Sequence, residues 1–129
     1  MNYTIDRTIS GADFDTVVER TRTALSGQGF GVLTEIDVKA TLKKKIDADV
    51  DNYLILGACN PKMAHQAMQL EPKVGAMLPC NVIVRSTGDN EVTVSAIDPI
   101  ASMKAIPNEQ LLSVAGIVRG MLEEVVAAV

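Results

Sequence analysis

The fold is decided by one stretch, Tyr53-Leu-Ile-Leu-Gly-Ala-Cys59-Asn60-Pro61, in which an apolar strand runs directly into a helix. Residues 52–59 are apolar on both faces of the predicted strand, which favours a place in the interior of a sheet. Asn60 suits the N-cap of a helix, and Pro61 suits its first position. The stretch therefore predicts an inner strand that ends where a helix begins.

Strands and helices alternate along the rest of the chain. Period-two patterns predict strands over residues 3–9 and 30–36, and an apolar run predicts one over 52–59. Residues 81–85 and 91–97 are predicted to form two further strands. Helical spacing and capping residues predict helices over residues 14–25, 37–46 and 61–70, and from 108 to the C-terminus. Thr87-Gly88-Asp89-Asn90 is typical of a hairpin turn between the last two strands.

This order of elements admits two architectures. Helices between most strands would suggest parallel crossovers. However, the helix at 37–46 is short and the hairpin makes the last two strands antiparallel. We therefore predict an α+β fold with a mostly antiparallel sheet, covered on one face by the first and last helices. No linker or repeat interrupts residues 1–129, which predicts a single domain.

Two details of the predicted strands bear on the faces of the sheet. In the second strand, Phe30, Val32, Thr34 and Ile36 are expected on one face, because alternate residues of a strand share a face. In the first strand, Arg7 interrupts an otherwise apolar face. A charge at such a position is expected to mark an edge strand.

Composition limits the kinds of partner. Only 3% of the 129 residues are aromatic and the net charge is −4. Few stacking side chains and an acidic surface both argue against nucleic acid as a partner. The chain shows no signal peptide and no uncharged run of about 18 residues, which predicts a cytoplasmic protein with no membrane partner. In the cytoplasm, Cys59 and Cys80 are expected to be reduced, free thiols.

Several short motifs together resemble one known family. They are Gly29-Phe-Gly-Val-Leu33, Tyr53 to Pro61, Leu78-Pro-Cys-Asn-Val82 and Ile97-Asp-Pro99. In this order they are similar to the family called domain of unknown function 302. The resemblance implies a small TATA-binding-protein-like domain, β-α-β-β-β-β-α with short inserted helices, and a homodimer. It implies no activity, substrate or catalytic residue, and a shared fold alone implies no binding of DNA.

The candidate site is the junction of two strand ends. If the strands that end at Cys59 and begin at Cys80 are antiparallel neighbours, the two cysteines lie close together, with Asn60 and Pro79 beside them. This concentration of unusual residues leads to the first hypothesis. The protein is a dimeric, non-enzymatic binding module that holds a small apolar or soft ligand near these four residues, with no cofactor and no metal ion.

Two other hypotheses use the same residues differently or not at all. The second is a thiol-dependent redox or sulfur-carrier protein that uses Cys59 and Cys80. The third is a structural or partner-binding domain without a pocket. The cysteine spacing matches neither a Cys-x-x-Cys pair nor a zinc motif, and free cysteines are often simply packed in a core.

Other candidate residues carry weaker signals. His65 lies opposite the apolar face of its predicted helix, so it is expected to point away from the sheet. Met63, Met68 and Met77 could bind copper(I), but core packing is the stronger expectation. Glu35 and Asp37 could form a carboxylate pair, but a solvated face and a helix cap are the stronger expectations, and Asp98 is expected in a turn. No catalytic signature is recognised, which favours a protein that is not an enzyme.

Overall fold

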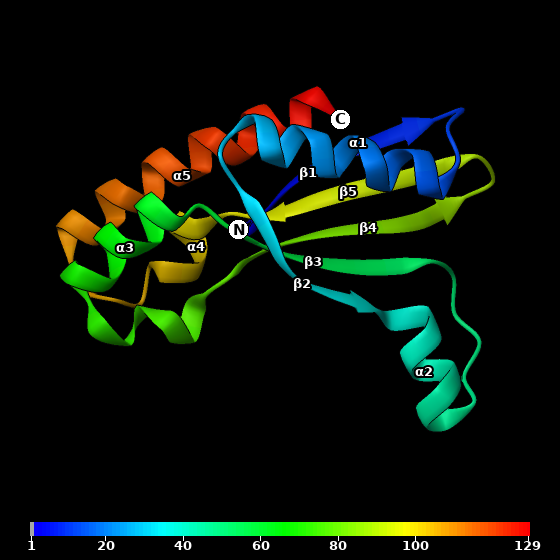
Figure 1. Cartoon of the computed structure of the whole chain (residues 1–129), viewed down its shortest axis with the longest axis horizontal. Coiled ribbons are helices and arrows are strands. Elements are labelled where there is room, and N and C mark those ends of the chain that lie inside the picture. The colour runs from blue at the N-terminus through cyan, green and yellow to red at the C-terminus, as the bar shows by residue number, and fades with distance from the viewer. Residues whose placement is uncertain (1) are drawn as a thin grey trace.

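Five strands form one antiparallel sheet in the order β1-β5-β4-β3-β2 (Figure 1). The computed structural model describes residues 2–129. The strands are β1 Thr4–Ser10, β2 Gly31–Asp37, β3 Tyr53–Cys59, β4 Cys80–Gly88 and β5 Glu91–Ile97. The α+β class and the antiparallel sheet are confirmed, and β3 has the predicted inner position between β2 and β4.

Helical segments connect the strands and follow the last one. They are α1 Phe14–Gly27, α2 Val38–Ile46, α3 Pro61–Leu70, the 3-10 helix η1 Pro72–Met77, α4 Pro99–Met103 and α5 Glu109–Ala128. Each α-helix begins after an Asp or Asn whose side chain accepts a hydrogen bond from a backbone N–H of the first turn. These five caps set the residue at which each α-helix begins. No helix within residues 2–129 has the length and apolar character needed to span a bilayer.

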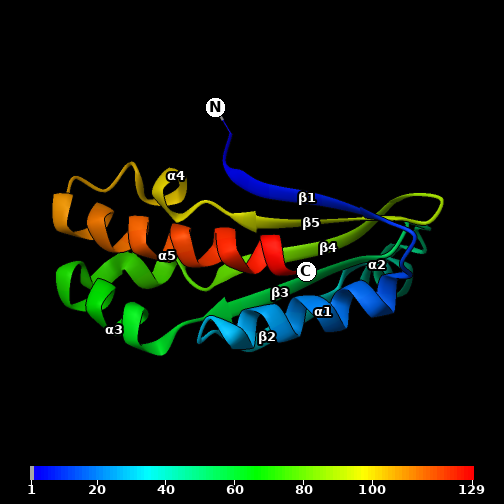
Figure 2. The ribbon, with the colours of Figure 1, turned by 90° about the horizontal axis from the view of Figure 1, so that it is seen from above.

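The main core lies between the sheet and the two long helices. Figure 2 shows α1 and α5 lying across the same face of the sheet, as predicted. Leu25 of α1, Leu122 of α5 and Leu56 of β3 are fully buried between these layers, together with the valines of β4 and β5. Burying such aliphatic side chains is the main stabilising contribution to a domain of this size.

Arg7 connects an edge of the sheet to the end of the last helix. β1 is an edge strand, as predicted, and Arg7 lies on its covered face opposite Val94. Its Nη1 donates hydrogen bonds to the carbonyl oxygens of Ala127 at 2.6 Å and Val129 at 2.9 Å. A cation at a helix C-terminus satisfies carbonyl groups that have no partner within the helix. Arg7 therefore helps to fix α5 on the sheet.

The prediction for β2 is wrong at one point. A register shift between Val32 and Thr34 leaves Leu33 without a paired residue on β3. Val32 pairs with Ala58 on the covered face, whereas Thr34 and Ile36 pair with Gly57 and Ile55 on the opposite face. A bulge inserts one residue and so reverses the alternation beyond it. The four residues expected on one face are therefore divided between the two faces.

Candidate functional site

The end of β3 and the start of β4 lie side by side. The register pairs Ala58 with Cys80, so Cys59 lies one residue beyond this pair, at the end of its strand. Paired residues share a face of the sheet, which places Cys80 on the covered face with Ala58. Alternation places Cys59 on the other side of the strand end. The two cysteines are thus close along the backbone, although their side chains leave the sheet on different sides.

A small cavity lies at this junction. Its volume is about 40 Å³, and Cys59, Asn60, Pro79 and Cys80 all line it. Apolar residues from four different parts of the chain complete the lining. They include Phe30, Met63, Ala67, Met103, Ala115 and Val118. The structure therefore brings together all four residues of the predicted junction, and adds a wall made by α3, α4 and α5.

The size of the cavity limits what it can hold. A water molecule needs roughly 10–15 Å³ of such volume, so the cavity can take only a few water-sized groups. Pockets for drug-sized ligands are larger, roughly 300 Å³ or more. In this conformation the cavity can hold a methyl-sized or short alkyl group rather than a whole large ligand.

Asn60 holds one side of the cavity in place. Its side-chain oxygen accepts a hydrogen bond from the Met63 backbone N–H at 3.2 Å, which caps α3. Its Nδ2 donates to the carbonyl oxygen of Gln28 at 3.4 Å and lies 3.9 Å from the sulfur of Met121. The close approach of Gly29, whose φ is 80°, leaves little space beside this amide. Since both polar atoms of Asn60 already have partners, this side chain is a positioning element.

The environment of Cys80 favours its protonated form. Burial, and to a lesser extent the nearby Cys59, raises the pKa of the Cys80 thiol from its ordinary 9.0 to about 11. Removing a thiolate from water costs free energy, so the neutral thiol is stabilised. Because the thiolate is the nucleophile, Cys80 is a poor nucleophile at neutral pH.

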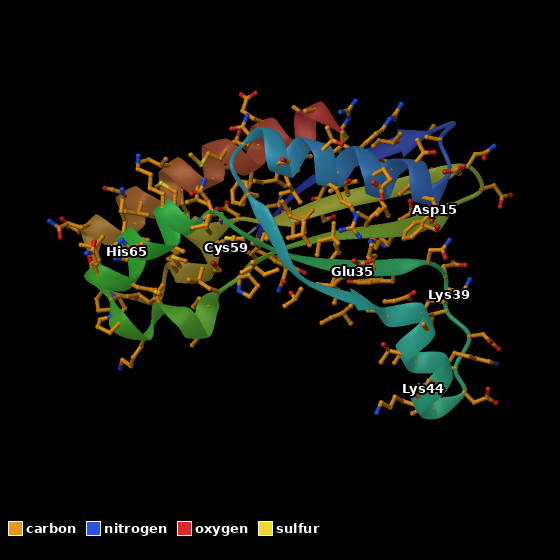
Figure 3. The ribbon with its side chains drawn as sticks, viewed as in Figure 1. Asp15, Glu35, Lys39, Lys44, Cys59 and His65 are labelled. Atoms are coloured by element: carbon orange, nitrogen blue, oxygen red, sulfur yellow. The ribbon has the colours of Figure 1, made fainter. Side chains whose placement is uncertain are left out.

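The other candidate residues of the sequence analysis are a histidine on the surface and three acids that form ion pairs or helix caps. His65 is exposed on α3 and lies far from the labelled Glu35, on the outer side of the molecule (Figure 3). Glu35 forms an ion pair with Arg22 at 2.7 Å, and Asp37 caps α2. Asp98 caps α4 and accepts a hydrogen bond from Nε of Arg119 at 3.0 Å. Within residues 2–129, no group of three or more His, Cys, Asp or Glu side chains is placed to hold a metal ion.

The structure differs from the sequence analysis in the positions of two methionines and in three residues that line the cavity. Core packing was expected for three methionines, but only Met63 is buried; Met68 and Met77 are 44% and 43% exposed. The wall residues Met103, Ala115 and Val118 were not assigned to the site. Ala115 and Val118 belong to the apolar stripe of the last helix, but that stripe is equally typical of any core helix. Met103 lies on α4, outside that stripe.

Comparisons with known proteins agree with this architecture. The crystal structure of an uncharacterized conserved protein DUF302 from Bacillus stearothermophilus is similar, with a TM-score of 0.90 and 22% sequence identity. The alignment covers 98% of this chain and 97% of that one. At this identity the likeness concerns the fold alone. No curated protein matches the chain. The family profile described as Domain of unknown function DUF302 matches residues 5–129. The resemblance seen in the motifs is therefore confirmed, and the chain belongs to the DUF302 family.

Proposed function

We propose that the protein is a non-enzymatic binding module that holds a small apolar ligand, or the small apolar end of a ligand, in the cavity at the β3–β4 junction. One observation carries the proposal. The cavity of about 40 Å³ is lined almost entirely by apolar surface, at the place where Cys59, Asn60, Pro79 and Cys80 meet. An apolar lining offers water few hydrogen-bond partners and so favours an apolar guest.

The chemistry of the walls supports an apolar guest. Asn60 uses its amide within the protein, and the Cys80 thiol is neutral, so recognition depends on shape rather than on charge. Met63 of α3 and Met103 of α4 both line the cavity, and methionine side chains are flexible and unbranched. Rotation of these methionines would enlarge the cavity for a longer alkyl group.

Xenon is a suitable probe for this site, because it binds dry apolar cavities. In methyl NMR spectra recorded under xenon pressure, we expect shifts at Ala58, Ala67 and Ala115, which line the cavity. Ala115→Leu fills the cavity and should abolish these shifts. The matched control is Ala127→Leu, an exposed position on the same helix, which should leave them unchanged. No shift in the wild-type protein, or an unchanged response in Ala115→Leu, would contradict the proposal.

A second, smaller cavity-filling substitution on another helix keeps the test valid if Ala115→Leu fails to fold. Ala67 is buried on α3 and also lines the cavity. Ala67→Val adds two methyl groups, a smaller change than Ala115→Leu, and should weaken the xenon response while the circular dichroism spectrum stays native. A folded Ala67→Val protein with the full wild-type response would count against the cavity as the binding site.

A thiol-dependent role is the second candidate, because both cysteines line the same cavity. The neutral state of Cys80 opposes it. We expect iodoacetamide to leave Cys80 unmodified in the native protein at pH 8, with alkylation rising only as the pH approaches about 11. Mass spectrometry of the native and the urea-unfolded protein measures this difference, since unfolding should make Cys80 reactive. Rapid alkylation of native Cys80 at pH 8 would favour the thiol-dependent role.

A further inference from the structure

Three buried sulfur-bearing side chains line the cavity at the β3–β4 junction. They are Cys80 of β4, Met63 of α3 and Met103 of α4. Thiolate and thioether sulfurs are soft ligands, which favour soft ions such as Cu(I). Among residues 2–129, no His, Asp or Glu side chain lines this cavity, so the oxygen and nitrogen ligands that harder ions prefer are absent from its wall.

Tertiary packing, and not a local motif, assembles this set of sulfur atoms. From the sequence alone, Met63 was grouped with Met68 and Met77, which are both exposed. In the structure, the residues that line the cavity with it are Cys80 and Met103. Met103 reaches this place because α4 packs against α5, beside the end of the sheet. The soft ligands therefore come from three elements that lie far apart in the chain.

The cavity lies where two packed groups of the core meet. Met63 and Cys80 belong to the main core, whereas Met103 belongs to a smaller core at the end of the molecule. Leu78 packs against both groups. Since all three sulfur-bearing side chains also line the cavity, they border one space from these two groups.

The size of this space suits a single ion. Its volume is about 40 Å³, whereas a water molecule needs roughly 10–15 Å³. Met63 and Met103 have unbranched side chains with several rotatable bonds, so their sulfur atoms can move toward an ion. The cavity can therefore close around an ion without a change in the backbone.

The charge balance favours a monovalent ion. When Cu(I) binds to Cys80, the S–H bond breaks, the proton passes to the solvent and a Cu–S bond forms. One positive charge enters and one leaves, so the net charge of the cavity stays at zero. A divalent ion beside a single thiolate would leave a positive charge within an apolar lining, which costs free energy.

We propose that Cys80, Met63 and Met103 bind one Cu(I) ion in the cavity at the β3–β4 junction. Cys80 supplies the thiolate, and the two methionines supply thioether sulfur atoms. Cys59 is outside this set, because its side chain leaves the sheet on the other side of the strand end. The inference goes beyond the proposed function, because it depends on the sulfur atoms of the cavity, whereas an apolar guest depends on its empty volume.

An anaerobic titration with Cu(I) bicinchoninate, a coloured chelator complex, tests the site. The wild-type protein should withdraw one Cu(I) ion per chain, and X-ray absorption should show a copper site with only sulfur ligands. Met63→Leu and Met103→Leu conserve volume and remove one ligand each, so each should weaken binding by at least about tenfold. Met68→Leu is the matched control on α3, since Met68 is 44% exposed, and it should bind as the wild type does.

Two cysteine variants distinguish this site from a simple pair of thiolates. Cys80→Ala removes the anionic ligand and should weaken binding by at least about a hundredfold, whereas Cys59→Ala should bind Cu(I) more tightly than Cys80→Ala does. Circular dichroism verifies that each variant is folded. Equal losses in the two cysteine variants, with wild-type binding in both methionine variants, would overturn the inference, as would a wild-type protein that leaves all copper with the chelator.

The copper titration and the xenon experiment fail separately. A protein that responds to xenon but takes no copper would retain the proposed function and exclude the metal site. A protein that takes copper through these three residues but shows no xenon shifts would support the metal site and contradict the apolar guest.

Discussion

Gly57→Ala is expected to lower the free energy of unfolding by about 3 kcal/mol, as overpacking in a core commonly does. A Cβ atom at position 57 would overlap Oγ1 of Thr34 and would lie 2.9 Å from Cγ of Pro79. Gly57 lies on an inner strand, so neither the backbone nor Pro79 can move aside without disturbing the β3–β4 junction. Urea unfolding followed by circular dichroism measures the loss.

Two further variants separate the overlap from a general effect of removing glycine. Gly31 is also in a strand, but a Cβ there would meet only the carbonyl oxygen of Cys59 at 4.0 Å. Gly31→Ala should therefore change stability by less than about 1 kcal/mol. Combining Gly57→Ala with Thr34→Gly removes the overlapping side chain, so the double variant should be more stable than the sum of the two changes predicts. Strictly additive losses would show that the Thr34 contact is not the cause.

Local signals were sufficient to predict the sheet and the longer helices, but not the short helical segments η1 and α4. Asn60 followed by Pro61 starts α3, and Pro72 limits it, because each acts on the few residues around it. The choice of an antiparallel sheet needed one more step, which was the short helix at 37–46. This helix is too short to form a crossover between parallel strands, so the two strands that it connects were predicted to be antiparallel. Each of these decisions depends on backbone chemistry within one segment.

The bulge in β2 shows where this reasoning fails. Leu33 carries no glycine or proline signal, and its neighbours alternate as an ordinary strand would. The extra residue is accommodated through pairing with β3, where Gly57 makes room for Thr34. That arrangement depends on a contact between two strands, so it cannot be predicted from the sequence of either strand alone. The error had a consequence, because it placed Ile36 on the same face as Val32, whereas Ile36 lies on the face of the sheet opposite α1 and α5.

The candidate site also combines residues that the sequence could predict with residues that it could not. Cys59, Asn60, Pro79 and Cys80 could be grouped from the sequence, because antiparallel pairing joins one strand's end to the next strand's start. The part of the wall from α5 could not be grouped with them, because it depends on how a distant helix lies on the sheet. Arg7 is similar: its sequence position indicated an edge strand, but its bonds to carbonyl groups about 120 residues later are a tertiary contact.

Leu122→Ala is expected to lower the free energy of unfolding by about 3 kcal/mol, within the usual range for a buried leucine. Leu122 is fully buried on α5, within the core between α1, α5 and the sheet. The loss combines the apolar contacts of the removed atoms with the cavity that they leave. Thermal and urea unfolding measure it.

Ile117→Ala on the same helix provides the comparison. Ile117 is 54% exposed, so its truncation removes little buried surface, and alanine's higher helix propensity offsets part of the loss. We expect a change of less than about 1 kcal/mol. If Leu122→Ala cost no more than Ile117→Ala, α5 would not be held by its buried stripe. Ala115 and Val118 on that stripe would then lack the fixed position that a preformed apolar cavity requires.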